Sequence, residues 1–193
     1  MILLVVGLVL FLGVHSVRIF AEGSRTRFIA ARGTNAWKGV YSLVSIVGIV
    51  LVCIGFGQAR ADTSLLWEPP RWTHDIAGLF TLAAFVLVTA AYVPGNAIKA
   101  KIRDPMIAGV KSWAFGHLLA NGTVADVILF GSFLAWAILD FRAARRRRAA
   151  IGGDEAMTVA SGRTGLTVAV GVALWAAFAF WLHGWLFGVR PFG

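Results

Sequence analysis

The sequence predicts an all-α integral membrane protein, a bundle of about six transmembrane helices that forms a single domain over residues 1–193. Of the 193 residues, 59% are hydrophobic and only 14% are charged, and the mean hydropathy is +0.78. Soluble domains carry about a quarter charged residues. No Pro/Gly/Ser-rich linker divides the chain, so all the apolar blocks are expected to share one packed interior.

The net charge of +9 comes from lysines and arginines in the short segments between apolar blocks. This pattern reports membrane orientation, and no nucleic-acid partner is expected. Three basic segments fall on alternate connections, at residues 18–38, 99–103 and 142–148. They are predicted to face the cytoplasm, which places both termini of a multi-pass protein of the bacterial inner (cytoplasmic) membrane in the periplasm.

The first helix is expected from Met1 to about Phe20 and is retained in the mature protein, because it lacks a basic n-region and a small-x-small cleavage site. The second is expected over residues 37–58. Pro69-Pro70 blocks helix formation in the next loop. Thr73 is the predicted N-cap of a third helix that runs to about residue 93, where Pro94-Gly95-Asn96 stops it.

Pro105 suits the first turn of a fourth helix over residues 105–120, and a turn at residues 121–122 leads to a fifth over residues 124–141. These two are short for a full crossing without tilt. Residues 149–163 are predicted to form a loop before a sixth helix over residues 164–189, whose tryptophans lie toward its outer end.

Ionisable groups inside transmembrane helices are costly, so the histidines are the first candidates for chemistry. His74 and His183 are expected at the outer interface, where water solvates them. His15 and His117 lie within apolar helices. Each is either a neutral imidazole hydrogen-bonded across a helix pair or one of two axial ligands of a haem b iron, presented from opposed helices.

Two depths are possible for His117. If Arg18 and Lys111 both mark the cytoplasmic interface, the two histidines differ in depth by about 4.5 Å, which suits one shared haem. If the fourth helix instead enters the hydrocarbon at Pro105, His117 lies much deeper and the match to one shared haem weakens. The cations Arg18, Lys38 and Lys111 are either partners of haem propionates or snorkelling interfacial residues.

Trp113, Ala114 and Asn121 share the helical face of His117. Ala114 and Gly116 are small enough to let a flat macrocycle approach, with Trp113 as an edge wall, although ordinary small-residue helix packing explains them equally well. The only cysteine, Cys53, is expected to be a small core residue.

Four stretches resemble the NnrU family of bacterial membrane proteins. They are MILLVVGLVLFLGVHSVRIF, NAWKGVYSLVS, AAYVPGNAIKAKIRDPMIAGVKSWAFGHLLANG and VILFGSFLAWAILDF. The family is in turn similar to the haem b zeta-carotene isomerases, which share a histidine-serine pair in the first stretch and a tryptophan four residues before the second histidine. This resemblance implies that His15 and His117 are haem ligands, and that reduction of the iron opens a site for a polyene double bond.

The resemblance also implies a link to nitrogen-oxide metabolism in denitrifying bacteria. The chain departs from the isomerases at Ala114, where they carry a cysteine proposed as an exchanging ligand, and at Asp104, where they carry a histidine. The resemblance as a whole implies one of two functions. The protein is either a redox-gated cis-trans isomerase of a polyene or isoprenoid, or a haem protein linked to nitric oxide, a small gas ligand. A haem-free methyltransferase-like or lipid-binding scaffold is the alternative, and the sequence names no partner reductase.

Overall fold

The computed structural model describes residues 1–61, 64–152 and 157–192, and this part of the chain is built from helices with one isolated β-bridge between Leu65 and Thr123. The elements are α1 (Ile2–Phe20), α2 (Glu22–Ala61), α3 (Arg71–Tyr92), α4 (Ala97–Ile102), α5 (Pro105–Ala120), α6 (Val124–Ala150), α7 (Arg163–Ala177), the π-helical turn η1 (Phe178–Leu182) and α8 (His183–Phe187). The predicted all-α membrane bundle is confirmed.

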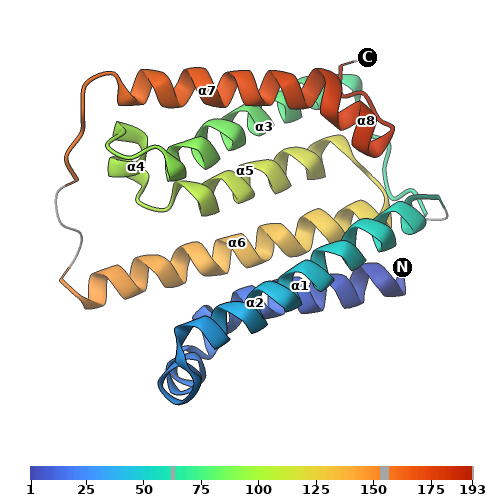
Figure 1. Ribbon diagram of the computed structural model, residues 1–193. Helices are drawn as coiled ribbons and strands as arrows, with labels where there is room; N and C mark the ends of the chain where they lie inside the picture. The colour runs from blue at the N-terminus through green and yellow to red at the C-terminus, as the bar shows by residue number, and fades with distance from the viewer. Residues whose placement is uncertain (62–63, 153–156, 193) are drawn as a thin grey trace.

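In the described part of the chain, five helical segments are long and apolar enough to cross a membrane. They are α1, α2, α3, α6 and the continuous stretch Arg163–Phe187. Helix α5 has 16 residues, which rise about 24 Å against a hydrocarbon core of about 30 Å. It nevertheless runs alongside α3 and α6 (Figure 1). The six predicted helices thus correspond to five of spanning length and the shorter α5.

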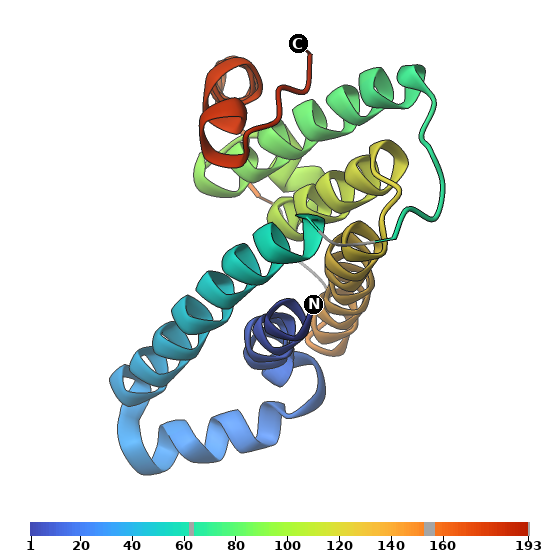
Figure 2. The same ribbon diagram turned by 90° about the vertical axis from the view of Figure 1, so that its right-hand side faces the viewer.

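The structure differs from the predicted bounds of two helices. The element α2 runs from Glu22, but its backbone at Gly33 is not helical (φ 82°, ψ 160°), so it joins a short helix before Gly33 to a longer helix after it, which begins close to the predicted start near Trp37. Residues 22–32 cross the end of the bundle before the chain turns along its length (Figure 2). Helix α6 continues through the arginine run to Ala150. Alanine and arginine are strong helix formers, so a polar run that ends a membrane span does not end the helix.

The helix starts follow local chemistry. Pro105 occupies the first turn of α5, as predicted. Thr73 is not the N-cap of α3: the helix begins at Arg71, directly after Pro70, and the Thr73 hydroxyl donates to the Pro70 carbonyl. At the start of α6, Thr123 and Asp126 form a reciprocal capping box.

The helices form two groups that meet at α6. Helix α1 packs on α2 in one group, and α3 packs on α5 and α7 in the other. Among the described residues, the backbones of α1 and α2 do not come within 8 Å of those of α3, α5 or α7, whereas α6 lies close to α1, α2 and α5 (Figures 1 and 2). Both termini lie at one end of the bundle, and the three basic segments lie at the other (Figure 1).

Glycines set the helix spacing within each group. A Cβ added at Gly55 would lie 2.2 Å from the Leu4 backbone nitrogen, and one at Gly48 would lie 2.7 Å from that of Phe11. In the other group, a Cβ added at Gly116 would lie 2.8 Å from the Phe80 Cβ. Backbones that approach this closely are typical of helix pairs in membranes.

Candidate functional site

His15 lies at the junction of α1, α2 and α6. Its Nδ1 is 2.6 Å from the Phe11 carbonyl oxygen, one turn earlier in α1. The imidazole centroid is 5.0 Å from the Tyr41 ring of α2 and 5.9 Å from the Trp136 ring of α6, which it meets edge-on. Three helices therefore hold this ring in a largely aromatic surrounding.

His117 lies between α5 and α6, near the end of α5. Its Nδ1 is 2.9 Å from the Trp113 carbonyl oxygen, and its ring stacks on Phe130 of α6 at 4.6 Å between centroids. The Trp113 ring is 5.1 Å away. Asn121 donates through Nδ2 to the His117 carbonyl and so closes the last turn of α5.

The same kind of local hydrogen bond decides which ring nitrogen carries the proton in each neutral imidazole. A carbonyl oxygen only accepts, so Nδ1 of each ring carries the proton and Nε2 keeps its lone pair. Across the described residues, neither Nε2 has a hydrogen-bond partner. Metal-bound histidines characteristically donate their second ring nitrogen to a carbonyl or carboxylate in this way.

The two histidines do not touch each other, and α6 with its aromatic side chains lies between them. His15 meets Trp136 and His117 meets Phe130. These two contact residues are six positions apart on α6, roughly 9 Å at 1.5 Å per residue. This offset along α6 is larger than the 4.5 Å expected if Arg18 and Lys111 mark one interface.

The Phe133 ring of α6 packs between α1 and α5. It is 5.8 Å from the Phe11 ring, one turn before His15 in α1, and 5.4 Å from the Trp113 ring, one turn before His117 in α5. A planar group that bridges α1 and α5 at this level would displace the ring.

Two polar side-chain atoms of α2 and α6 are buried without a hydrogen-bond partner. They are the Ser45 Oγ and the Trp136 Nε1, and the Trp136 ring meets His15. The free Nε2 of each imidazole is a neutral nitrogen donor of the kind that binds haem iron, so the chemistry of the two histidines fits haem.

The small residues on α5 have packing roles. Ala114 is completely buried, and the close approach of Phe80 to Gly116 shows that this glycine admits α3. The structure thus favours helix packing over a gap for a macrocycle as the explanation of Gly116. Asp104, at the position of the isomerase histidine, forms an ion pair with Arg148 of α6.

The three predicted propionate partners lie toward the basic end of the bundle. Arg18 Nε is 3.8 Å from a Glu22 carboxylate oxygen, and Lys111 Nζ lies 4.6 Å from the centroid of the Phe141 ring. Lys38 is exposed on α2. Two of the three cations therefore already have partners within the chain.

The remaining candidates lie away from this region. His74 is exposed at the start of α3, and His183 Nδ1 is 2.7 Å from the Val189 carbonyl near the C-terminus. Cys53 is exposed, so the expectation of a core cysteine is wrong. Among the described residues, no three side chains of His, Cys, Asp or Glu gather into a metal-binding group.

The aromatic residues around the two histidines were not among the predicted site residues. They are Phe11, Tyr41, Phe130, Phe133 and Trp136. A signal was present, because Phe130, Phe133 and Trp136 recur at three-residue spacing and so share one face of α6. In an apolar span this pattern is also what ordinary core packing produces.

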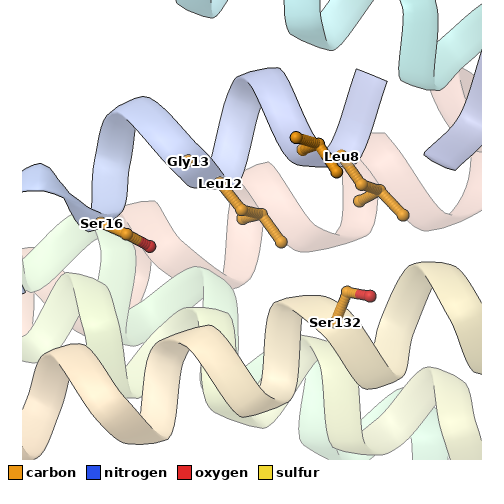
Figure 3. Close-up of a pocket in the computed structure, with 6 residues that line it drawn as sticks. Leu8, Leu12, Gly13, Ser16 and Ser132 are labelled. Carbon is orange, nitrogen blue, oxygen red and sulfur yellow. The ribbon is translucent and has the colours of Figure 1, made fainter. Parts of the chain in front are cut away.

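An open groove of about 330 Å³ runs beside His15 between α1 and α6. It is lined by Leu8, Val9, Leu12, Gly13, Ser16 and Ser132, and Figure 3 shows Leu12 and the Ser132 hydroxyl directed into it. Neither histidine lines the groove. Its wall is mainly apolar, with two hydroxyls from facing helices.

Comparison with known proteins gives one match. The family model described as NnrU protein matches residues 3–191. No curated protein and no solved structure matches the chain significantly.

Proposed function

We propose that this chain, which belongs to the NnrU family, is an integral membrane protein that binds haem b, whose iron His15 and His117 would hold. The observation that carries the proposal is the shared hydrogen bond from each Nδ1 to a carbonyl one turn earlier, which leaves Nε2 free to bind a metal. Both rings are lined by aromatic side chains, as is usual for binding sites of apolar ligands.

Haem b would supply an iron that cycles between the ferric and ferrous states and takes up small ligands when a coordination position is open. The residues of the chain would orient it: the Phe11 and Trp113 carbonyls hold the imidazole planes, and Trp113 stands beside the His117 ring. Ala114 provides no thiolate, so any change of ligand at that position proceeds without sulfur.

Two reactions fit such a protein in a lipid bilayer. One is redox-gated cis-trans isomerisation of a hydrophobic polyene or isoprenoid, and the other is the binding or handling of nitric oxide in denitrification. Both require a reductant. We place the protein in the bacterial inner membrane with both termini periplasmic, because both termini lie at the end of the bundle opposite the three basic segments (Figure 1).

The haem-free alternative is a lipid-binding scaffold, and one observation favours it. The groove between α1 and α6 opens along apolar side chains, and the Phe133 ring already packs between Phe11 of α1 and Trp113 of α5. A lipid chain could lie in that groove without any movement of the core. No comparable feature of the described residues favours the methyltransferase-like form.

An absorption spectrum separates the two functions. Protein purified from haem-replete cells is expected to show a Soret band that shifts on reduction. His15→Ala and His117→Ala should each remove or displace it, whereas His74→Ala, at an exposed histidine, should not. A colourless wild-type protein without iron would refute haem binding, and two ligand variants with the wild-type spectrum would refute the assigned ligands.

The two haem reactions are distinguished by supplying their ligands. If the protein is an isomerase, the reduced form incubated with a cis-polyene yields a trans product, which chromatography detects. A spectral change on addition of nitric oxide without polyene turnover favours the gas-linked role.

A further inference from the structure

We propose that the short helix at residues 22–32 lies in the headgroup layer of the membrane and binds anionic phospholipids through Arg27 and Arg32. The ligand is the phosphate of the lipid headgroup, at the basic end of the bundle. The inference does not depend on haem, because this segment is a different part of the chain from the two histidine sites.

The short helix runs across the direction of the spanning helices. Figure 2 looks along the bundle from the end that holds both termini, and in this view residues 22–32 run sideways at the outer edge, beyond α1. At Gly33, where φ is 82°, a value that glycine adopts readily, α2 turns back along the bundle. A helix that lies crosswise at the end of a span is parallel to the membrane surface, at the depth of the lipid headgroups.

The segment has an apolar side that faces the longer part of α2 and a side that is open. Phe28 and Ile29 are half-buried, and the Phe28 ring meets the Trp37 ring at 5.8 Å between centroids. A helix shorter than about 12 residues is only marginally stable in water, and binding to a membrane interface stabilises it. The open side carries small and polar residues, which are Gly23, Ser24, Thr26, Arg27, Ala30, Ala31 and Arg32.

Two arginines on this segment have no acidic partner. Its one acid is Glu22, whose carboxylate is 2.8 Å from Arg25 Nη1 and 3.8 Å from Arg18 Nε. Arg27 donates through Nη2 to a neutral serine hydroxyl one turn earlier. Arg32 is exposed, and neither it nor Arg27 forms an ion pair within the described part of the chain. Both guanidinium groups are therefore available to anions from outside the chain.

A phospholipid phosphate suits these two groups. A guanidinium presents its N–H donors in a fork that matches the oxygens of a phosphate. Each arginine near a membrane surface favours lipids with a net negative charge by about fivefold. Arg27 and Arg32 are about 7.5 Å apart along the helix axis, so each is able to hold its own headgroup.

The test measures which lipid surrounds the segment. Cys53, the only cysteine, is replaced by serine, and Ala30→Cys carries a fluorophore on the open side of the short helix. The full-length protein is reconstituted into bilayers of phosphatidylcholine and phosphatidylglycerol. One lipid or the other is brominated high on its acyl chains, so that it quenches a neighbouring fluorophore. The two quenching curves give the local preference for phosphatidylglycerol.

Three variants separate the site from the overall charge. The site variant is Arg27→Gln with Arg32→Gln. The charge control is Lys101→Gln with Arg163→Gln, which removes the same charge from two exposed residues of α4 and α7 at the same end of the bundle (Figure 1). The conservative variant is Arg27→Lys with Arg32→Lys, which keeps the charge of the short helix.

In the otherwise unchanged protein, phosphatidylglycerol should be preferred at position 30 by about fivefold or more, and raising the salt concentration should weaken this preference. The site variant should bring the preference close to one, whereas the charge control and the conservative variant should keep most of it. Quenching by neither lipid would show that the segment lies outside the headgroup layer. No preference before mutation, or an equal loss in the site variant and either comparison variant, would also overturn the inference. These results do not depend on whether the protein carries haem.

Discussion

Each membrane-embedded histidine satisfies one ring nitrogen within its own helix, and this local arrangement decides which nitrogen remains available. A histidine four residues after a carbonyl on the same helical face can donate Nδ1 to it without help from a neighbouring helix. The free Nε2 then points away from the helix that carries it. At the residue scale, the ligand hypothesis thus depends on one hydrogen bond per histidine.

The positions of His15 and His117 could be read from the sequence, but their neighbours could not. Periodicity shows that Phe130 and Phe133 share a face of α6, yet it does not show which helix that face meets. Tyr41 precedes the middle of an apolar run, and only the antiparallel packing of α1 and α2 brings its ring beside His15. Contacts between helices distant in sequence therefore account for the missed residues.

Phe133 provides a residue-scale prediction. Replacement by alanine removes the ring between Phe11 and Trp113, so the haem-free protein loses packing but a bound haem no longer has to displace the ring. We expect a lower melting temperature without haem and a larger rise on haem addition than in wild type. Thermal unfolding in detergent, with and without haem, measures both.

The control for this prediction is Phe56→Ala. Phe56 of α2 contacts Phe130, at 6.1 Å between ring centroids, but has no ring contact with Phe11 or Trp113 among the described residues. The Phe56→Ala substitution should lower the melting temperature without enlarging the rise in melting temperature that haem causes. Equal haem-induced shifts in wild type and Phe133→Ala would contradict the view that this ring occupies the cofactor space.

At the scale of the element, hydropathy predicted where helices cross but not where they end. The start of α5 at Pro105 agreed with prediction because a first-turn proline is a backbone signal. The end of α6 was missed because its arginine run marks the membrane boundary while remaining a good helix former, and the short helix before Gly33 was missed for the same reason.

The α1–α2 contact gives a prediction at this scale. Gly55→Ala should force the helices apart, because the added Cβ would lie 2.2 Å from a backbone atom that cannot rotate away. A loss of about 1–3 kcal/mol in the free energy of unfolding is expected from such overpacking. Gly57→Ala, two residues along the same helix and with nothing within 4 Å of its added Cβ, should be neutral or slightly stabilising.

Reversible unfolding by SDS titration in mixed micelles measures both variants. A Gly55→Ala protein as stable as Gly57→Ala would show that α1 and α2 are not packed as closely as described.

At the scale of the whole molecule, the sequence predicted the class and the alternation of basic segments, and the bundle agrees in placing these segments together at one end. It did not predict the division into two helix groups. That division depends on which apolar helix faces meet. Apolar faces of membrane helices resemble one another in composition, and the small residues that allow close packing decide which pairs form.

Orientation is testable with single cysteines on a Cys53→Ser background. Ser64→Cys, at an exposed position in the connection between α2 and α3, should react with an impermeant maleimide added to spheroplasts. Arg146→Cys, exposed in the arginine run of α6, should react only after the membrane is permeabilised. The reverse pattern would invert the proposed topology.

Helix α6 lies between the two helix groups, and this arrangement has a consequence for assembly. His15 belongs to one group and His117 to the other, and the described packing joins the groups only through α6. A haem bound by both would act as a non-peptide cross-link, closing a loop of about a hundred residues much as a disulfide does. Cofactor loading would then be the last step of maturation, and the unloaded chain, free to open around α6, would be the form most exposed to membrane proteases.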